Sequence, residues 1–368
     1  MITWHAYDLR TNTALAELPL RARCGDVLNG VGMFEATLQL PAGSPAAVRA
    51  LLDATTPERT IVYASRDGRM LGGWIIWTRS RGSAGTVQLR GASVLSFLRR
   101  NRLVATLGWH ADPTYSRYAG TWAAPADQLT IARALVTALQ GQPGANINID
   151  TTDTALSGVV RERVYWATER KNVGDALVEL ASVENGFDLA FACAWVAGAP
   201  KITLQLGYPR LGRLAVDNQV VIESGKNLLS WSIEEDGSRS ARSVDAVGAG
   251  DGPNMLVTTS TRSEWIAAGW PLTADMVSYK TVTDMATLAA HAAAASAERA
   301  ATPQWLQVTV APDDPDGGLG AWTLGDFARV SITDTAMPDP FAANVRIIGW
   351  QLTAGDTDEL ALTLAQVP

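Results

Sequence analysis

The residues that could perform acid–base or metal chemistry in this chain are few and lie far apart in the sequence. There are only three histidines, His5, His110 and His291. His291 lies in an alanine-rich run with no histidine or glutamate at metal-ligand spacing, and the chain contains no HExxH motif. His110 has Asp112 and Tyr115 nearby, in a loop-like segment without a nucleophile motif. The histidines therefore predict neither a metal site nor an acid–base pair.

Nucleophile and phosphate-binding motifs are also missing from the sequence. The run GASVL at 91–95 lacks the final glycine of a G-x-S-x-G elbow, and we predict GAGDG at 248–252 as a turn between strands. Cys24 and Cys193 are far apart and have no CxxC partner, which is typical of small buried residues. These patterns predict a protein that is not an enzyme, with no catalytic, cofactor-binding or metal-binding residues.

One acidic cluster, DDPDGG at 313–318, has some features of a calcium-binding loop. It lacks the third acidic position and the distant glutamate of an EF-hand loop, and Pro315 restricts its backbone. We therefore predict a solvated turn at the rim of a β-barrel, with no metal ion bound.

Thirteen tryptophans are more than an average chain of this length contains. One group falls inside strand patterns, where core or subunit-interface packing is the favoured interpretation: Trp74, Trp77, Trp231 and Trp350. A second group falls in predicted loops and offers contacts to partners: Trp109, Trp122, Trp265 and Trp270. Exposed indole rings also stack on sugars, so a carbohydrate-binding adsorption protein is an alternative hypothesis, and a cell-wall hydrolase is a weaker one.

The bulk composition excludes several classes of protein. Hydrophobic residues make up 47% and charged residues 18% of the 368 residues, so wholesale disorder is excluded. The net charge is −7, and Lys and Arg are scattered along the sequence, so no basic patch that would bind nucleic acid is predicted. An acidic wall would nevertheless suit a conduit through which DNA passes. No apolar run of membrane-spanning length occurs, and the first residues lack a signal-peptide pattern. We expect the protein to stay in the compartment where it is made.

The first hundred residues predict β-structure with one helix. Residues 33–40 alternate apolar and polar side chains, as a strand with one buried face does. Ser44 and Pro45 are placed as N-cap and first residue of a short helix. Further strands are predicted at 60–65, 73–79 and 86–90.

The rest of the chain alternates helical and strand patterns. Two amphipathic helices, 127–140 and 172–184, precede strands near 187–196 and 201–206, which together indicate a small α/β domain. A third helix, 283–301, has a face made mostly of alanine, which permits close approach of another element. Strands are predicted around 228–236 and 243–250, and then at 304–310, 327–332, 345–352 and 359–364.

A shift of 273 positions aligns IIWTRSRGSAGTVQLR at 75–90 with IGWQLTAGDTDELALT at 348–363. Trp77 then falls on Trp350, and both segments read as strand, glycine-containing turn, strand. Hairpins have few ways to differ, so chance similarity is an open alternative. A true repeat would give the chain two copies of one β-barrel, and a trimer would then present six similar units around one axis.

The order of these elements resembles that of tail hub proteins of long-tailed bacteriophages, in particular minor tail proteins of actinobacteriophages related to the siphovirus Gp37-like family. The resemblance depends on NLLSWSIEEDGSRSARSVDAVGAG at 227–250 and on AWTLGDFARVSI at 321–332, followed by VRIIGWQL. The positions that match the family's short motifs are Asp236, Ser238, Val247, Gly248, Leu324, Gly325, Asp326 and Val330.

This resemblance implies an α+β, mainly β fold and a homotrimeric, pseudo-sixfold ring that joins the tail tube to the tip. The implied domains are a first tube-like β-barrel domain at 1–105, an inserted α/β domain at 106–212, a second tube-like barrel at 213–262 and 304–368, and a helical insertion at 263–303. The partners would be a distal tail protein or tube ring above, tip, fibre or tape-measure proteins below, and genomic DNA in passage.

The location implied is the distal tail tip of the virion, after assembly in the host cytoplasm. Because the chain stops at Pro368, shortly after its last predicted strand, we expect a bare hub without an appended enzyme or fibre.

Overall fold

The computed structural model describes residues 2–83, 85–102, 119–121, 126–161, 163–166, 170–183, 185–213, 220–280, 282–301, 304–355 and 358–366. These residues are mainly β-strand with fewer helices, which confirms the predicted α+β, mainly β class. The chain divides into two compact units: Met1–Ser230 together with Val308–Pro368, and Trp231–Gln307.

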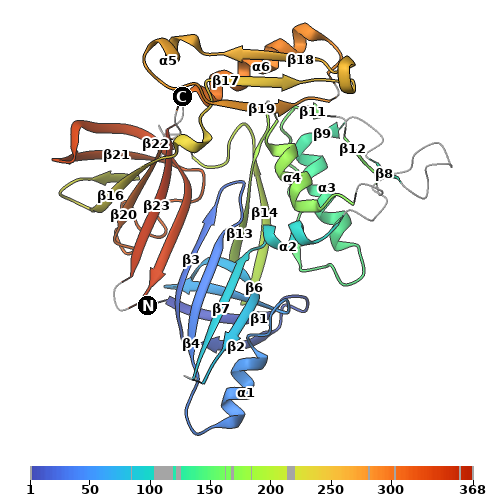
Figure 1. Cartoon of the computed structure of the whole chain (residues 1–368). Helices are drawn as coiled ribbons and strands as arrows, with labels where there is room; N and C mark the ends of the chain where they lie inside the picture. The colour runs from blue at the N-terminus through green and yellow to red at the C-terminus, as the bar shows by residue number, and fades with distance from the viewer. Residues whose placement is uncertain are drawn as a thin grey trace. The chain divides into compact units, whose positions relative to one another are not determined.

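A first group of strands is formed by the N-terminal part of the chain (Figure 1). Its members are β1 (Ile2–Asp8), β2 (Ala14–Leu18), β3 (Leu20–Val27), β4 (Met33–Gln39), β5 (Thr60–Arg66), β6 (Arg69–Arg81) and β7 (Thr86–Ser93). They pair in the order β3-β4-β7-β6-β5-β1-β2, and every pair is antiparallel. Alternation along β4 buries Phe34, Ala36 and Leu38, as the sequence predicts.

A second group of strands repeats this order. Its members are β15 (Val221–Glu223), β16 (Leu228–Glu235), β20 (Gln304–Val310), β21 (Phe327–Asp334), β22 (Met337–Ala354) and β23 (Glu359–Gln366). The series β16-β20-β23-β22-β21 matches β3-β4-β7-β6-β5 strand for strand, in both sheet order and chain order. The sixth strand differs, because β15 is parallel to β21 whereas β1 is antiparallel to β5. The chain therefore carries one five-stranded arrangement twice.

The two groups join into a single sheet through β22 and β3. Separate closed barrels were predicted, but no barrel closes among the described strands. The reason is that one edge of β22 pairs with β3 of the first strand group. In a closed barrel that edge would pair with a strand of the same barrel.

The predicted repeat is a hairpin in both copies, but its residue correspondence is shifted. Leu89 lies opposite Arg79 in the first copy, whereas Leu362 lies opposite Trp350 in the second. When the second strands of the hairpins are aligned, Trp350 therefore matches Arg79 and not Trp77. Each first strand also contains a bulge, beside Ile76 in β6 and beside Ile347 in β22.

The segment between the two groups contributes helices and a small sheet. Its main elements are α2 (Leu95–Arg100), α3 (Gln128–Gln140), α4 (Val173–Ala181), β10 (Ile149–Asp150), β13 (Asp188–Val196) and β14 (Ala199–Gly207). The short strands β8 (Ala119–Thr121), β9 (Ala126–Asp127), β11 (Val160–Arg161) and β12 (Val164–Trp166) form two small ladders. Apolar residues of α3 and α4 share one core with Ile61, Tyr63 and Ile75 of the first strand group. Much of the predicted 106–212 segment is thus packed onto the 1–105 segment.

Local signals in the sequence set where the helices begin. Ser44 accepts a hydrogen bond from the Ala47 amide and starts α1 (Pro45–Asp53). Asp127 caps α3 and Asn172 caps α4 in the same way.

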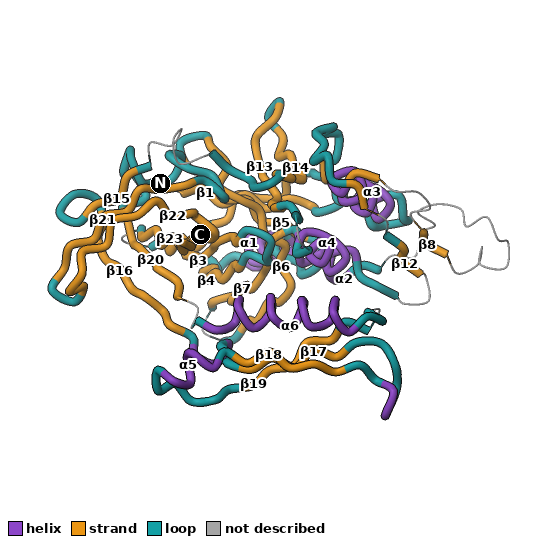
Figure 2. Tube along the Cα trace, turned by 90° about the horizontal axis from the view of Figure 1, so that it is seen from above, coloured by secondary structure: helices purple, strands orange, loops and turns teal. Residues whose placement is uncertain are grey.

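The second unit is a three-stranded sheet with one long helix against it (Figure 2). Strand β17 (Ser243–Val247) pairs antiparallel with β18 (Val257–Thr261) and parallel with β19 (Ala274–Ser278). Helices α5 (Ser263–Ala267) and α6 (Met285–Ala300) complete it. The small buried side chains Ala292 and Ala295 bring α6 close to Val244 and Ala246, as the alanine pattern predicts. The unit contains the predicted 263–303 insertion together with β17 and β18.

Candidate functional site

The histidines that are described take part in packing. His5 contacts the hydroxyl of Ser65 at 2.9 Å, and its ring meets Trp195 edge to face. His291 stacks on Tyr279 with ring centroids 4.5 Å apart. In the part of the chain that the structure describes, no group of His, Cys, Asp or Glu side chains is arranged to hold a metal ion. The predicted loop candidates lie outside the described residues: Trp109, His110, Asp112, Tyr115 and Trp122.

The acidic run 313–318 folds as a turn held by one carboxylate. Asp314 accepts hydrogen bonds through Oδ1 from the amides of Asp316 and Gly317 and from the side chain of Asn227. Its oxygen is therefore engaged by the loop itself and by the neighbouring β15–β16 connection.

Of the candidate nucleophiles, Ser93 and Cys24 are buried and Cys193 is half-buried. Ser93 accepts a hydrogen bond from the Gly32 amide at 2.8 Å, which holds the β3–β4 connection against β7. Both cysteines are free thiols. Burial raises the pKa of Cys193 to about 12 and raises the pKa of Cys24 further. Neither thiol would be ionised near neutral pH, so neither is activated for nucleophilic attack.

Two of the four strand tryptophans, Trp74 and Trp350, lie where the two strand groups meet, whereas Trp77 contacts Ser96 and Arg100 of α2. Trp74 of β6 is 1% exposed and donates to the Gly25 carbonyl of β3 at 2.9 Å. Its ring stacks near Phe34, at 5.9 Å, and meets Trp350 of β22 edge to face at 6.1 Å. Trp322 contacts the other side of Trp350. Core packing, one of the two predicted roles, is therefore confirmed for Trp74 and Trp350.

Two of the tryptophans that were predicted in loops form a pair in the second unit, but Trp265 lies in α5 and not in a loop. The rings of Trp265 and Trp270 meet edge to face at 5.5 Å, and the buried guanidinium of Arg242 lies 4.9 Å from each ring. Trp270 is 45% exposed, so this pair is accessible at the surface of its own unit.

The in-chain joint between the strand groups has a defined register. Gly349–Ala354 of β22 pairs antiparallel with 22–27 of β3, from Gly349 opposite Val27 to Ala354 opposite Ala22. The N-terminal half of β22 pairs with β21, and its C-terminal half pairs with β23 along the opposite edge. Strands β21 and β3 therefore pair with the same edge of β22, β21 along its first part and β3 along its last part.

The equivalent edges on the other strand group are open. Strand β5 covers β6 only as far as Ile75, so the same edge of Thr78–Arg81 has no strand partner among the described residues. Strand β16, the equivalent of β3, ends the sheet and pairs with β20 alone among the described strands. The in-chain joint pairs an edge of β3 with an edge of β22. The corresponding edges, on β16 and on Thr78–Arg81 of β6, are both open among the described residues.

A buried polar junction fixes the second strand group to the α/β segment. Arg346 of β22 forms an ion pair with Asp188 at the start of β13, and both side chains are about one-tenth exposed. Arg346 also donates to the carbonyls of Gly325, at 3.0 Å, and Leu211, at 2.7 Å. Asp188 accepts from the side chain of Asn29 at 2.9 Å. Five stretches of chain meet at this one ion pair.

The Leu324-Gly325-Asp326 motif belongs to the same junction. Gly325 has φ +94°, and a Cβ there would collide with the Leu211 carbonyl. Asp326 accepts hydrogen bonds from Arg213 at 2.6 and 3.0 Å and from the Thr323 amide at 2.9 Å. Burial acts to raise the pKa of Asp326, but these hydrogen bonds outweigh it and hold the pKa below its ordinary value.

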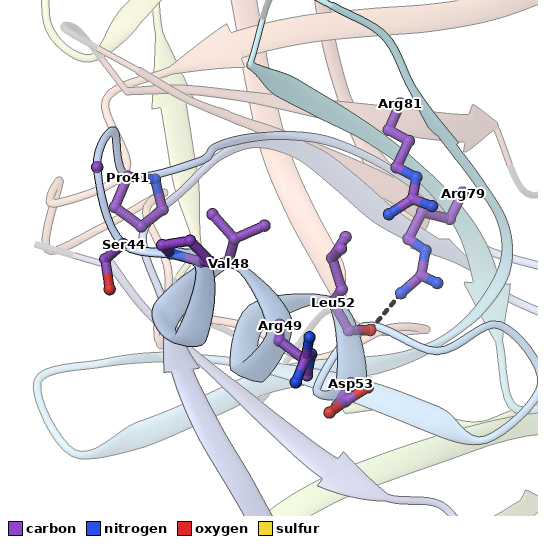
Figure 3. A pocket seen from close by; sticks show the side chains of 10 residues that line it. Pro41, Ser44, Val48, Arg49, Leu52, Asp53, Arg79 and Arg81 are labelled. Carbon is purple, nitrogen blue, oxygen red and sulfur yellow. Dashed lines mark hydrogen bonds between the residues drawn. The ribbon is translucent and has the colours of Figure 1, made fainter.

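A groove of about 690 Å³ lies between α1 and the open end of β6 (Figure 3). Val48 and Leu52 supply apolar side chains to it, and Arg49, Arg79 and Arg81 supply three cations. Arg79 donates to the Leu52 carbonyl, which ties the strand to the helix. These arginines were not singled out from the sequence, although Arg79 and Arg81 at alternate positions of a strand must lie on one face.

No family model matches the chain, and no curated protein matches it in sequence. Solved structures do match. The chain is similar to the tail protein from Neisseria meningitidis MC58, with a TM-score of 0.56, 14% identity, and coverage of 99% of this chain and 96% of that one. It is also similar to the 43 kDa tail protein of prophage MuSo2 from Shewanella oneidensis, with a TM-score of 0.55, 9% identity, and coverage of 99% and 98%.

A chain of the Francisella PdpA–VgrG complex is similar over 100% of this chain and 59% of its own length, with a TM-score of 0.54 and 9% identity. The first two matches cover nearly the whole of both chains, so the likeness includes both strand groups, the α/β segment and the second unit. The chain therefore has the fold of these phage tail proteins.

Proposed function

We propose that this protein is a structural tail hub of a long-tailed phage, and more narrowly a minor tail protein of the actinobacteriophage, siphovirus Gp37-like type. In this proposal three copies form a pseudo-sixfold ring between the tail tube and the tail tip. The fold likeness to phage tail proteins supports the tail role. The narrower assignment depends on the motifs at 227–250 and 321–332.

The observation that carries the proposal is the repeated strand order within one chain. Two strand groups with the same five-stranded arrangement are joined edge to edge by β22 and β3. Three such chains would supply six similar groups, and an edge-to-edge contact that is repeated by rotation closes into a ring. In this scheme the tube-like domains lie within 1–105 and within the two segments 213–262 and 304–368, and 106–212 and 263–303 are insertions. Strands β17 and β18, which fall in 213–262, belong to the second unit and would form part of the second insertion.

The ring would act as a passage and a connector. A distal tail protein or a tube ring would lie above it, and tip, fibre or tape-measure proteins below it. Genomic DNA would pass through the lumen without sequence-specific binding, since a chain of net charge −7 repels the phosphate backbone on the whole. The proposed place is the distal tail tip of the virion, after assembly in the host cytoplasm, and the proposed role includes no catalysis.

The mass of the purified chain in solution tests this proposal. Light scattering should give three times the chain mass of 39.1 kDa. Electron cryo-microscopy of phage tails should then place six similar β-groups around one axis near the distal end. A monomer at micromolar concentration, together with absence of the chain from purified tails, would overturn the proposal.

A carbohydrate-binding role remains the second candidate, and the exposed Trp265–Trp270 pair favours it. The face of an exposed indole ring such as that of Trp270 stacks on sugar rings. Binding of the purified chain to cell-wall glycans that is lost in Trp270→Ala and kept in Trp305→Ala would support this second candidate over a purely structural role.

A further inference from the structure

We propose that neighbouring copies join by pairing β16 of one copy with the open edge of β6 of the next, over the α1–β6 groove. This inference rests on the proposed ring and identifies the partner of the groove as a second copy of this chain. It assigns the contact to particular strands and charges.

The in-chain joint supplies the geometric argument. In that joint, the edge of β3 opposite β4 pairs with the C-terminal half of β22 on the edge opposite β23. By the shared strand order, β16 is the equivalent of β3 and β6 is the equivalent of β22. The corresponding edges are the outer edge of β16 and the edge of Thr78–Arg81 opposite β7, which are the two open edges described above. One contact, formed once inside each chain and once between chains, gives a closed ring of alternating groups.

The two open edges carry opposite charge. Arg49, Arg79 and Arg81 line the groove, and none of them forms an ion pair within the described part of the chain. Burial and the neighbouring Arg81 both lower the pKa of Arg79, and they outweigh Asp53, the one acidic residue that lines the groove, which acts to raise it. The groove therefore favours an acidic partner.

Strand β16 supplies that acidic partner. Its C-terminal end carries Glu234 and Glu235, and both are exposed in the isolated chain. Adjacent residues of a strand point to opposite faces, so either face of β16 would bring one carboxylate to the arginines. Leu229, 61% exposed, and Ile233, 40% exposed, add apolar area that pairing would cover.

Open edges of this kind are normally protected in a protein that acts alone. An edge strand usually carries charged side chains, especially lysine, or a proline or a bulge that blocks pairing with other chains. Strand β16, LLSWSIEE, has no lysine or proline, its only charges are the two glutamates at its C-terminal end, and Leu229 and Ile233 are exposed before them. A strand edge of this composition is expected to be covered in the assembled state.

A charge swap tests the contact. The double variant Arg49→Glu/Arg81→Glu should lower the trimer fraction at least about tenfold at micromolar concentration, because close interfacial charge pairs contribute on the order of 1.5 kcal/mol or more. Glu234→Arg/Glu235→Arg should have the same effect. The chain with all four substitutions should recover the trimer. The matched control Arg10→Glu/Arg210→Glu changes the same charge at two other exposed arginines and should leave the trimer intact.

The outcomes separate this inference from the proposed function. Trimers of unchanged stability in both double variants would overturn the β16–β6 contact while leaving the trimeric hub in place. A monomeric wild-type chain would overturn the trimer and the contact together. Failure of the fourfold variant to recover, with a circular dichroism spectrum like that of the wild type, would also contradict the charge pairing.

Cysteine crosslinking provides a test that does not depend on the charge variants. Ser80→Cys should form a disulfide between copies with Ser230→Cys or with Ser232→Cys, whichever faces it in the paired register. Ser80→Cys combined with Ser182→Cys is the control and should stay uncrosslinked. Absence of crosslinked trimers from both test pairs would overturn the contact.

Discussion

Buried charges in this protein are held at the places where separate stretches of chain meet. The ion pair of Arg346 with Asp188 links β22 to the start of β13, and the Arg213–Asp326 pair links the end of the α/β segment to the Leu-Gly-Asp motif. A buried pair of this kind contributes little net stability compared with apolar packing, but removing one partner leaves an uncompensated charge. The junction should therefore be sensitive to single substitutions.

Arg346→Met should lower the free energy of unfolding by about 3–5 kcal/mol, because Asp188 would keep its charge without its buried partner. Urea denaturation of the wild type and the variant measures this loss. Arg90→Met, which removes an exposed pair with Glu35, is the control and should cost less than about 1 kcal/mol. Equal losses of unfolding free energy in the two variants would show that the buried ion pair is no more sensitive to substitution than an exposed one.

Asp26 gives the protein a pH dependence near neutrality. Burial raises the pKa of its carboxyl to about 7, although hydrogen bonds from Val27, Ser93 and Gly32 act to lower it. A pKa raised above the ordinary value of 3.8 means that the stabilising form is protonated. Its contribution is complete below pH 3.8 and is lost as the pH rises through 7.

Asp26→Asn should remove this dependence, because the amide stays neutral at every pH. Relative to the wild type, the variant should gain stability between pH 4 and pH 7.5, by at most about 4 kcal/mol. Urea midpoints of both proteins at pH 4.5, 6 and 7.5 measure the difference. Asp8, whose pKa is lowered to about 2, acts only at the acid end and does not disturb this window. A difference between the two proteins that is constant with pH would contradict the assignment.

At the scale of elements, helix ends were well predicted from the sequence and long-range pairing was not. The starts of three helices can be recognised in the sequence, because a cap is a local interaction with an amide two or three residues away. The cap residues are Ser44, Asp127 and Asn172. The hairpin of β22 and β23 was predicted for a related reason, since its two strands are close in sequence. Helix α2 was missed because its six residues are too few to show a helical period.

The shifted hairpin correspondence has a physical cause. Trp77 and Trp350 match in sequence, but the two hairpins pair their strands in different registers. Each first strand has one bulge, and the two-residue offset between the hairpins is the same on both sides of it, so the pairing set at the turn causes the difference and the bulges do not. The residues that matter for assembly, Arg79 and Arg81, were missed because nothing in the sequence shows which edge of a strand is covered.

The side chain of Asp127, the N-cap residue of α3, accepts several hydrogen bonds at the start of this helix. One carboxylate oxygen caps α3 through the Leu129 amide, and the other accepts from the amides of Ser157 and Gly158 and from the Ser157 hydroxyl. Asp127→Ala should lower the free energy of unfolding by about 1–2 kcal/mol, as measured by urea denaturation. Ser157→Ala loses the hydroxyl contact to Asp127 and the hydrogen bond that the hydroxyl accepts from the Val159 amide, but it keeps the cap of α3, so it should cost less. A larger loss in Ser157→Ala would contradict the capping argument.

For the whole molecule, the second unit is an insertion into a strand connection. The equivalent strands β3 and β4 are linked by residues 28–32 alone, whereas β16 and β20 are separated by most of Trp231–Gln307. The unit has its own sheet, its own helix and its own small cores. The sequence showed the helix at 283–301 but not the parallel partner β19, whose pairing with β17 depends on contacts distant in the chain.

Replacing residues 236–303 by a short Gly- and Asn-containing turn should therefore leave the first unit folded. Strands β16 and β20 would be joined as β3 and β4 are, and every pairing of the two strand groups would be kept. The expected result is a smaller chain with a cooperative urea transition, a β-type circular dichroism spectrum and the same oligomeric state as the full chain. The reason is that the ring contacts proposed above use only β3, β6, β16, β22 and α1. Loss of the cooperative transition would show that the second unit is needed for folding. A folded chain that no longer assembles would instead assign part of the ring contact to the second unit.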